Sequence, residues 1–132
     1  MNKLHIYELP ITNEFRRQKR LIQERGELSL IEDGDTFRHL GYFSLLVNKG
    51  YRGGHYHQQK NEKFYVISGS LQIDLIDVES LKKEQVKAEA GTKITIYPGL
   101  AHLFQAIEDA QVIEYYNAVF DNSDDIPFNF SL

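Results

Sequence analysis

Hydrophobic and polar residues alternate along most of this chain with a period of two, the period of a β-strand that has one face against a core. The alternating segments are short, and clusters of glycine, proline, asparagine, aspartate or serine separate them. Such even spacing favours an all-β antiparallel barrel or two-sheet structure, because closure protects the strand edges. The predicted strands are Leu28–Ile31, Tyr42–Asn48, His55–His57, Phe64–Ser68, Leu71–Asp77, Gln85–Ala88, Lys93–Tyr97, Leu103–Ile107 and Val112–Ala118.

Two segments depart from the strand pattern. Val78–Lys87 has some helical character, and Thr12–Gln23 predicts a helical or irregular lead-in within residues 1–23. The chain has 132 residues, the size of one domain, and shows no linker or internal repeat. We therefore expect a single domain over residues 1–132, with any active site built into its core and without an organic cofactor.

Composition narrows the classes of partner. Nineteen acidic residues outnumber fifteen basic ones, which argues against nucleic-acid binding. The absence of cysteine excludes disulfides and thiolate chemistry. No apolar stretch approaches the length of a membrane span, so we expect no membrane association and a cytoplasmic location.

The stretch RGGHYHQQKNEKFYVISG contains the first candidate chemistry. On a strand, His55 and His57 face the same side while Tyr56 faces the other. If the chain turns after His57, Glu62 begins the next strand beside the histidines. A buried carboxylate needs a partner, and a divalent cation held by two imidazoles and a carboxylate would supply one. Such ligands suit zinc, iron, manganese or nickel, although histidines also occur as ordinary surface residues.

A second stretch, GTKITIYPGLAHLFQA, adds His102 after a Pro98-Gly99 turn. The two stretches resemble the two motifs of the cupin superfamily, with Tyr97 and Ala106 departing from the second motif. The resemblance implies a small antiparallel β-barrel, or jelly roll. It also implies one bound divalent metal, zinc in the first place. The metal ligands that it implies are His55, His57, Glu62 and His102. Neither His5 nor His39 matches a cupin position, and Lys60 and Lys63 are interpreted as charged hairpin positions.

The run ERGELSLIEDGDTFRHLGYFSLL, ahead of RGGHYH, resembles the opening of the WxcM-like sugar-nucleotide cupins. The stretch that begins at Arg52 is also similar to the cupin domain of capsular enzymes that make UDP-N-acetyl-L-fucosamine. The resemblance implies an isomerase that acts on a nucleotide-linked 4-keto-6-deoxy sugar in surface-polysaccharide biosynthesis. The reaction would be C3 epimerisation or 3,4-ketoisomerisation through an enolate. The family likeness and exposed strand edges suggest a homodimer.

Both reactions need a base for the proton next to the ketone and a donor or cation for the enolate oxygen. In a metal-bound version the ion occupies the histidines, and a tyrosine such as Tyr42, Tyr115 or Tyr116 shuttles protons. The WxcM-like cupins include 3,4-ketoisomerases, and the resemblance to them implies a metal-free version of the site. In that version His55 or His57 is itself the base. Arg52 is a candidate for binding the pyrophosphate, provided that a bulge at Gly53-Gly54 turns it toward the histidines, and Tyr115 is a second candidate substrate contact.

Two other functions fit the same residues. Three histidines and a glutamate also suit a metal-dependent cupin oxygenase on a small substrate, which would consume oxygen with bound iron. A non-catalytic sugar-binding cupin would bind a nucleotide sugar and leave it unchanged. The cupin fold hosts many chemistries, so the fold does not distinguish these alternatives.

Overall fold

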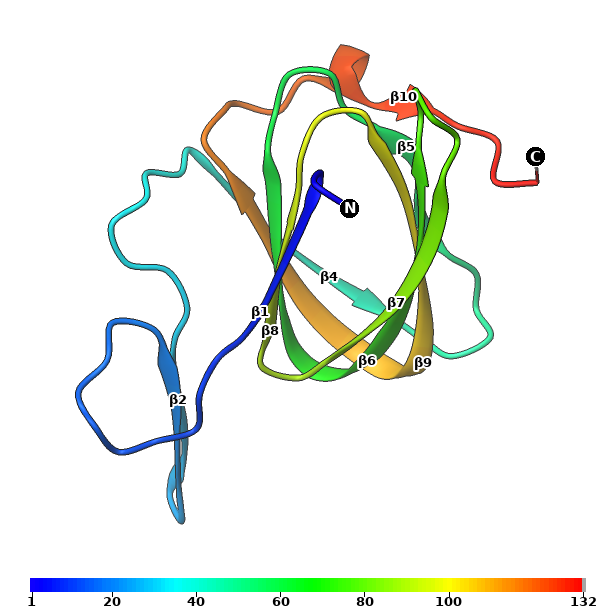
Figure 1. The fold of residues 1–132 in the computed structure, drawn as a ribbon. Helices are drawn as coiled ribbons and strands as arrows, with labels where there is room; N and C mark the ends of the chain where they lie inside the picture. Colours follow the sequence, from blue (N-terminus) through cyan, green and yellow to red (C-terminus); the bar gives the residue numbers. More distant parts are fainter. Residues whose placement is uncertain (132) are drawn as a thin grey trace.

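The computed structural model describes residues 1–131, most of which form antiparallel β-strands wound into a barrel (Figure 1). Two long strands, β6 (Glu62–Asp77) and β9 (Leu100–Tyr116), pair with each other along nearly their whole lengths. Register shifts between Val66 and Leu71 divide this pairing into two parts. Each long strand therefore belongs to one sheet in its first part and to a second sheet in its last part.

The shorter strands extend these two sheets. One sheet has the order β1-β8-β6-β9-β4, and the other has the order β7-β6-β9-β5-β10. The bounds are β1 (Leu4–Glu8), β4 (His39–Leu45), β5 (Arg52–Tyr56), β7 (Lys83–Glu89), β8 (Thr92–Ile96) and β10 (Ile126–Pro127). This arrangement confirms the predicted all-β antiparallel barrel of the jelly-roll type.

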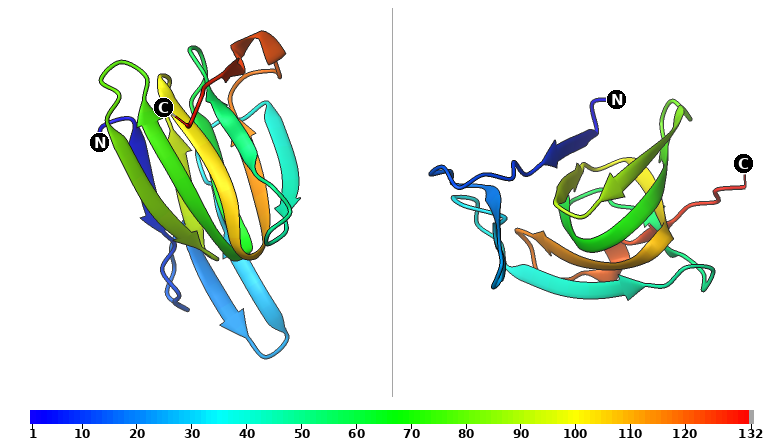
Figure 2. Two further views of the ribbon diagram at one scale, coloured as in Figure 1. Left: turned by 90° about the vertical axis from the view of Figure 1, so that its right-hand side faces the viewer. Right: turned by 90° about the horizontal axis from the view of Figure 1, so that it is seen from below.

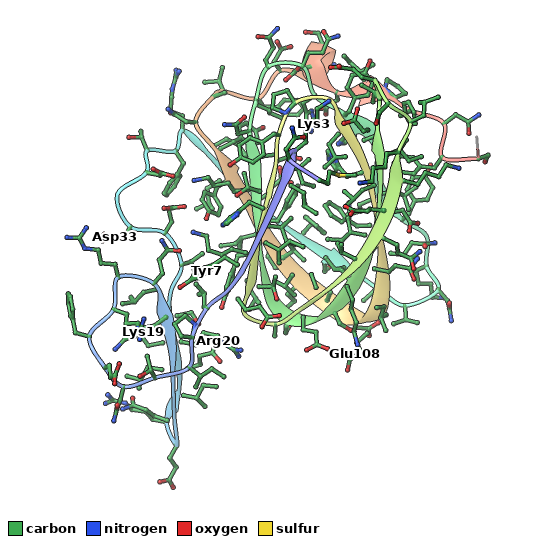
Figure 3. All side chains as sticks on the ribbon, in the orientation of Figure 1. Lys3, Tyr7, Lys19, Arg20, Asp33 and Glu108 are labelled. Carbon is green, nitrogen blue, oxygen red and sulfur yellow. The ribbon has the colours of Figure 1, made fainter. Side chains whose placement is uncertain are left out.

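The hairpin of β2 (Lys19–Gln23) and β3 (Gly26–Leu30) forms a separate small sheet. It stands away from the barrel in all three views (Figures 1 and 2). Arg20 joins it to the barrel: Nη1 donates a hydrogen bond to the carbonyl of Ala90, and Nη2 pairs with Glu27 at 2.8 Å. Figure 3 shows Arg20 at this junction. A short 3-10 helix, η1 (Asn122–Asp124), precedes β10.

The core is the set of inward-facing positions on the two sheets. Along β6, for example, Phe64 and Val66 are buried, and the alternation resumes at Leu71 after the register shifts. The largest buried cluster consists of Phe43, Leu45, Phe64, Val66, Leu71, Ile73, Leu75, Ala88, Ile94, Ile96, Leu100, Phe104, Ala110 and Val112. These β-branched and aromatic residues favour strands because they pack well on a pleated surface.

Two breaks between predicted strands, read from the sequence as turns, lie inside continuous strands. Ser68-Gly69-Ser70 is part of β6, and Glu108-Asp109 is part of β9, so each predicted pair of short strands is one long strand. Gly69 has a φ of +79°, and a side chain there would overlap the carbonyl oxygen of Asp109. The glycine therefore marks a bulge where the paired strands pass from one sheet to the other.

Neither segment expected to depart from strand structure forms a helix, but the irregular alternative for the lead-in is confirmed between β1 and β2. Much of Val78–Lys87 belongs to β7, which pairs with β6, because the partner strand outweighs local helical character. The N-terminal 23 residues contain β1 and β2 rather than a helix, with β1 extending the first sheet beside β8. Within residues 1–131 there is no helix with the length and apolar character of a membrane span.

Candidate functional site: a buried histidine and glutamate cluster

Four side chains with metal-ligating atoms converge inside the barrel. His55 on β5 lies opposite His102 on β9, and Glu62 is the first residue of β6. His57 follows the end of β5 and is buried together with Glu62 and His102. One ligand atom from each of the four residues lies within 4.8 Å of the others. The structure thus brings together four residues that two separate sequence motifs predicted.

Gly53 allows β5 to approach β9 closely beside this cluster. Its φ is +87°, and a Cβ atom at this position would lie 2.6 Å from the carbonyl oxygen of His102. The register between β5 and β9 shifts between Gly53 and His55, which is a bulge. The bulge brings Arg52 to the cavity that contains the histidines, as its predicted role required.

Backbone carbonyls orient two of the imidazoles. Nδ1 of His102 lies 3.0 Å from the carbonyl oxygen of Leu100, and Nδ1 of His57 lies 2.9 Å from that of Asp124. When each Nδ1–H donates to its carbonyl, each Nε2 is left with a lone pair. Both Nε2 atoms face Oε1 of Glu62, at 3.1 Å from His57 and 3.3 Å from His102. Acceptor atoms therefore point at one another and need a proton or a cation between them.

The donor set fits a divalent metal. Nε2 of His102 is buried and has no hydrogen-bond partner among residues 1–131, which leaves its lone pair directed at the cluster. Histidines that bind metals commonly donate their other ring nitrogen to a carbonyl, as His57 and His102 do. Neutral imidazoles with one carboxylate are ligands for zinc, iron, manganese or nickel.

Without a cation the cluster distributes charge unevenly. Burial and the neighbouring His102 and His57 lower the pKa of His55 to about 4, so His55 is neutral near pH 7. Burial alone would lower the pKa of His57, but its hydrogen bond to Glu62 raises this pKa above its ordinary value. Burial likewise opposes ionisation of Glu62, but the imidazoles of His102 and His57 hold the pKa of this carboxyl well below its usual range. The carboxylate is therefore charged at neutral pH.

A cavity of about 210 Å³ opens beside the cluster. Its lining combines aromatic rings with charged side chains, and Arg52 lies at its edge with Nε donating to the carbonyl of Ser44 at 3.0 Å. This volume is below the range typical of pockets for drug-sized ligands, so a small ring fits it better than a nucleotide. The lining residues are Phe43, Arg52, Gly53, His55, Lys60, Glu62, Phe64, His102, Phe104, Glu114, Phe120 and Asp125.

The predicted tyrosines lie elsewhere. Tyr42 is 58% exposed, because its neighbour Phe43 takes the inward position on β4. Tyr115 also faces outward: its hydroxyl donates to Glu32 at 3.0 Å, and it lines a larger hollow of about 550 Å³ beside the hairpin. Tyr116 is inward but does not line the histidine cavity. The position of Tyr42 thus removes the support for its predicted catalytic role, and Tyr115 contacts a different cavity from the histidines.

Three charged residues at the cavity were not predicted. Lys60, interpreted as a surface position, is 8% exposed and holds its Nζ 4.1 Å from the ring centre of Tyr116. It also lies 3.6 Å from both Glu62 and Asp125. Glu114 lines the same cavity. Lys60 and Glu62 are two positions apart, and such residues face the same side of an extended chain. This spacing could have identified Lys60 as inward-facing.

Comparisons with known proteins agree with this geometry. A family model described as the polysaccharide biosynthesis C-terminal domain matches residues 24–126. A search of curated proteins gives no significant match.

Among solved structures, a double mutant of the 3,4-ketoisomerase QdtA from Thermoanaerobacterium thermosaccharolyticum, in complex with TDP, superposes with a TM-score of 0.78 at 17% identity. The superposition covers 99% of this chain and 91% of that one. The TDP-quinovose 3,4-ketoisomerase WlaRB from Campylobacter jejuni gives 0.77 at 17% identity, covering 99% and 96%. The 3'-monoepimerase ChmJ from Streptomyces bikiniensis gives 0.75 at 14% identity, covering 92% and 67%. These likenesses establish the cupin fold.

Proposed function

Because this chain belongs to the polysaccharide biosynthesis C-terminal domain family, we propose that it is an isomerase of a nucleotide-linked 4-keto-6-deoxy sugar. The reaction is C3 epimerisation or 3,4-ketoisomerisation in surface-polysaccharide biosynthesis. The observation that supports it best is the buried cluster of His55, His57, Glu62 and His102 beside a cavity with room for one sugar ring. Similar solved structures are described as ketoisomerases and an epimerase of TDP-linked sugars.

The four clustered residues are proposed to hold one divalent metal, zinc in the first place. When bound, such an ion acts as a Lewis acid toward a ketone or enolate oxygen. The chain itself holds the ligands in place: the carbonyls of Leu100 and Asp124 fix the tautomers of His102 and His57. Preorganised ligands and donors cost no rearrangement at the moment of reaction.

Arg52 is proposed to meet the diphosphate at the edge of the cavity. Its guanidinium lies 5.5 Å from the ring centre of Phe43 and donates to the carbonyl of Ser44, which fixes the side chain at the opening. A guanidinium forms paired hydrogen bonds to phosphate oxygens. The sugar ring would enter the cavity, while the diphosphate and the base remain outside it.

The test is solvent deuterium incorporation. The protein is incubated in D2O with TDP- and UDP-linked 4-keto-6-deoxy sugars, and the carbon next to the ketone is followed by NMR. Incorporation at that carbon, with an epimer or a 3-keto product, is the expected result. Tight binding of the nucleotide sugar without incorporation would instead favour the sugar-binding cupin, and oxygen consumption with bound iron would favour the oxygenase.

We also propose a homodimer. Large apolar side chains are exposed on the outer face of β4 and on the hairpin, including Leu40, Tyr42 and Leu28, each more than half exposed. Such a surface is more typical of an interface than of a monomer's exterior. Light scattering at micromolar concentration is the measurement, and a monomer would overturn this part of the proposal. The cytoplasmic location stays a prediction.

A further inference from the structure

A second pair of titratable side chains, one of which lines the cavity, lies outside the cluster. Glu114 on β9 and His39 on β4 approach to 3.4 Å between Oε2 and Nε2. Glu114 lines the cavity together with His55 and Glu62. The ring of His39 stacks on that of Tyr116 at a centroid distance of 4.2 Å, which fixes the imidazole behind the carboxylate.

This pair occupies inward positions that a core would normally fill with apolar residues. In the strand register, Glu114 lies between Gly41 on β4 and Phe64 on β6, and the neighbouring inward residue on β9 is the buried Val112. An inward carboxylate in such a row costs free energy unless it is paired. His39 supplies one partner, and the remaining surface of the Glu114 carboxylate faces the cavity.

Gly41 provides the room for the pair. A Cβ atom at this position would lie 3.1 Å from Cγ of Glu114 and 3.2 Å from Nε2 of His39. Any larger residue in place of Gly41 would therefore press on the side chains of Glu114 and His39. The carboxylate side chain and the imidazole occupy the space that a side chain at this position would need.

We infer that Glu114 is the group that exchanges a proton with the substrate carbon next to the ketone, and that His39 is its positioning residue. This inference rests on the proposed function. The cluster residues contact one another and, in the proposed function, hold a metal, while Tyr42 and Tyr115 face away from the cavity. Two carboxylates outside the cluster line the cavity, Asp125 and Glu114. Asp125 lies 3.2 Å from Nδ1 of the cluster residue His57 and 3.6 Å from Nζ of Lys60. Glu114 instead has an imidazole from outside the cluster, that of His39, behind it.

The step balances with water as the further proton donor and acceptor. The C3–H bond breaks, its proton moves to a carboxylate oxygen of Glu114, and its electron pair forms the C3=C4 double bond. The former ketone oxygen takes the negative charge. Donation of a proton from water to C3 on the other face gives the epimer, and Glu114 then releases its own proton to water to restore the carboxylate. Return of a proton to C4, with transfer of the O3 proton to the former ketone oxygen, gives the 3-keto isomer.

Charges around Glu114 favour this role. Burial raises the pKa of Glu114 above its ordinary value, and the charge of Glu62 adds to this rise where no cation neutralises it. His39 and Lys60 oppose the rise by less. A carboxylate with a raised pKa is a better base toward carbon while it is still ionised at neutral pH. Removal of His39 is therefore expected to raise the pKa of Glu114 further.

The principal test is Glu114→Gln, assayed for deuterium incorporation with TDP-4-keto-6-deoxyglucose and a UDP-linked 4-keto sugar. The rate at C3 is expected to fall about 10²- to 10⁴-fold, the usual contribution of a general acid-base group. Zinc content, measured by elemental analysis, should equal that of the wild type. Glu89→Gln, at an exposed position paired with Lys87, is the matched control and should leave both quantities unchanged.

The positioning role has its own readout. His39→Phe keeps an aromatic ring on Tyr116 and removes the nitrogen that faces Glu114. In the pH profile of the exchange rate, the fall in rate on the acidic side should move to higher pH. A merely structural loss would instead lower the rate by the same factor at every pH.

The outcomes separate the two proposals. If the wild type incorporates deuterium and Glu114→Gln does so at the same rate, the inference is wrong and the proposed function stands. Loss of zinc from Glu114→Gln would also overturn the inference, because Glu114 would then support the metal ligands. If the wild type incorporates no deuterium from any of these sugars, the proposed function fails and the role of Glu114 fails with it.

Discussion

Replacement of Glu62 by glutamine is the sharpest test of the metal centre. Glu62 contributes the only charged ligand atom of the cluster, within 3.3 Å of Nε2 of both His57 and His102. The variant keeps the size of the side chain and loses the charge. We expect its zinc affinity to fall at least about 100-fold, because an amide oxygen is a poor zinc ligand.

The size of the effect on stability follows from mass action. With a zinc dissociation constant of about 1 µM, about 100 µM zinc stabilises the wild type by about 2.7 kcal/mol. With a constant of about 100 µM, the same zinc stabilises the variant by only about 0.4 kcal/mol. For 132 residues, an unfolding entropy of about 2.1 cal/mol/K per residue converts these values to shifts of about 10 °C and about 1.5 °C.

The assay is thermal unfolding after removal of metal with a chelator. Each shift is measured from the protein's own metal-free midpoint, so that the lost contacts of Glu62 with His57 and Lys60 do not enter. Glu89→Gln serves as the control and should shift as the wild type does. Equal shifts in the wild type and in Glu62→Gln would mean that zinc binds elsewhere. A wild type that responds to none of zinc, iron, manganese and nickel would remove the metal centre altogether.

Three further changes test other parts of the structure. Burial opposes ionisation of Glu32, but its contacts with Tyr115 and two lysines lower the pKa of this carboxyl. Its contribution to the free energy of unfolding is therefore present above about pH 4.5 and is lost as the pH falls through the lowered pKa. Glu32→Gln should therefore cost about 2 kcal/mol at pH 7 and less at pH 3, and an equal cost in urea unfolding at both pH values would contradict this reasoning. Gly69→Ala should destabilise the barrel by at least about 2 kcal/mol, because Gly69 has a positive φ and abuts the backbone of Asp109; an unchanged urea midpoint would disprove it. Arg52→Ala should weaken TDP binding in calorimetry about 10- to 100-fold, the effect of losing a charged hydrogen bond, and unchanged affinity would place the diphosphate elsewhere.

The period of two was sufficient to predict the class of fold, and the bulges explain where it misled. Gly69 interrupts the alternation within β6, and a glycine between serines has the composition of a turn. Only the pairing with β9, which comes much later in the chain, keeps the strand continuous. The strand β1 was missed because its burial is slight and its stability comes from β8.

Three of the four cluster residues could be predicted because their spacing is local, whereas His102 was identified by the resemblance to the second cupin motif. His55, His57 and Glu62 belong to one hairpin, and alternation alone sets their direction. Glu114 and His39 could not be paired in advance, since their contact depends on the register between β4 and β9. The outward direction of Tyr42 could not be predicted for the same kind of reason: an aromatic next to another aromatic, Phe43, gives no sign of which one faces inward.

The chain order of the ligands has a consequence for folding kinetics. His102 reaches the cluster only when the early part of β9 pairs with β5 and the late part of β6, contacts between segments far apart in the sequence. Such non-local pairings form late, because closing a long loop costs entropy before it is compensated by contacts. The complete ligand set therefore exists only in a nearly native barrel. Zinc is expected to slow unfolding and to leave the refolding rate unchanged, so the protein acquires kinetic stability from the metal after it has folded without it.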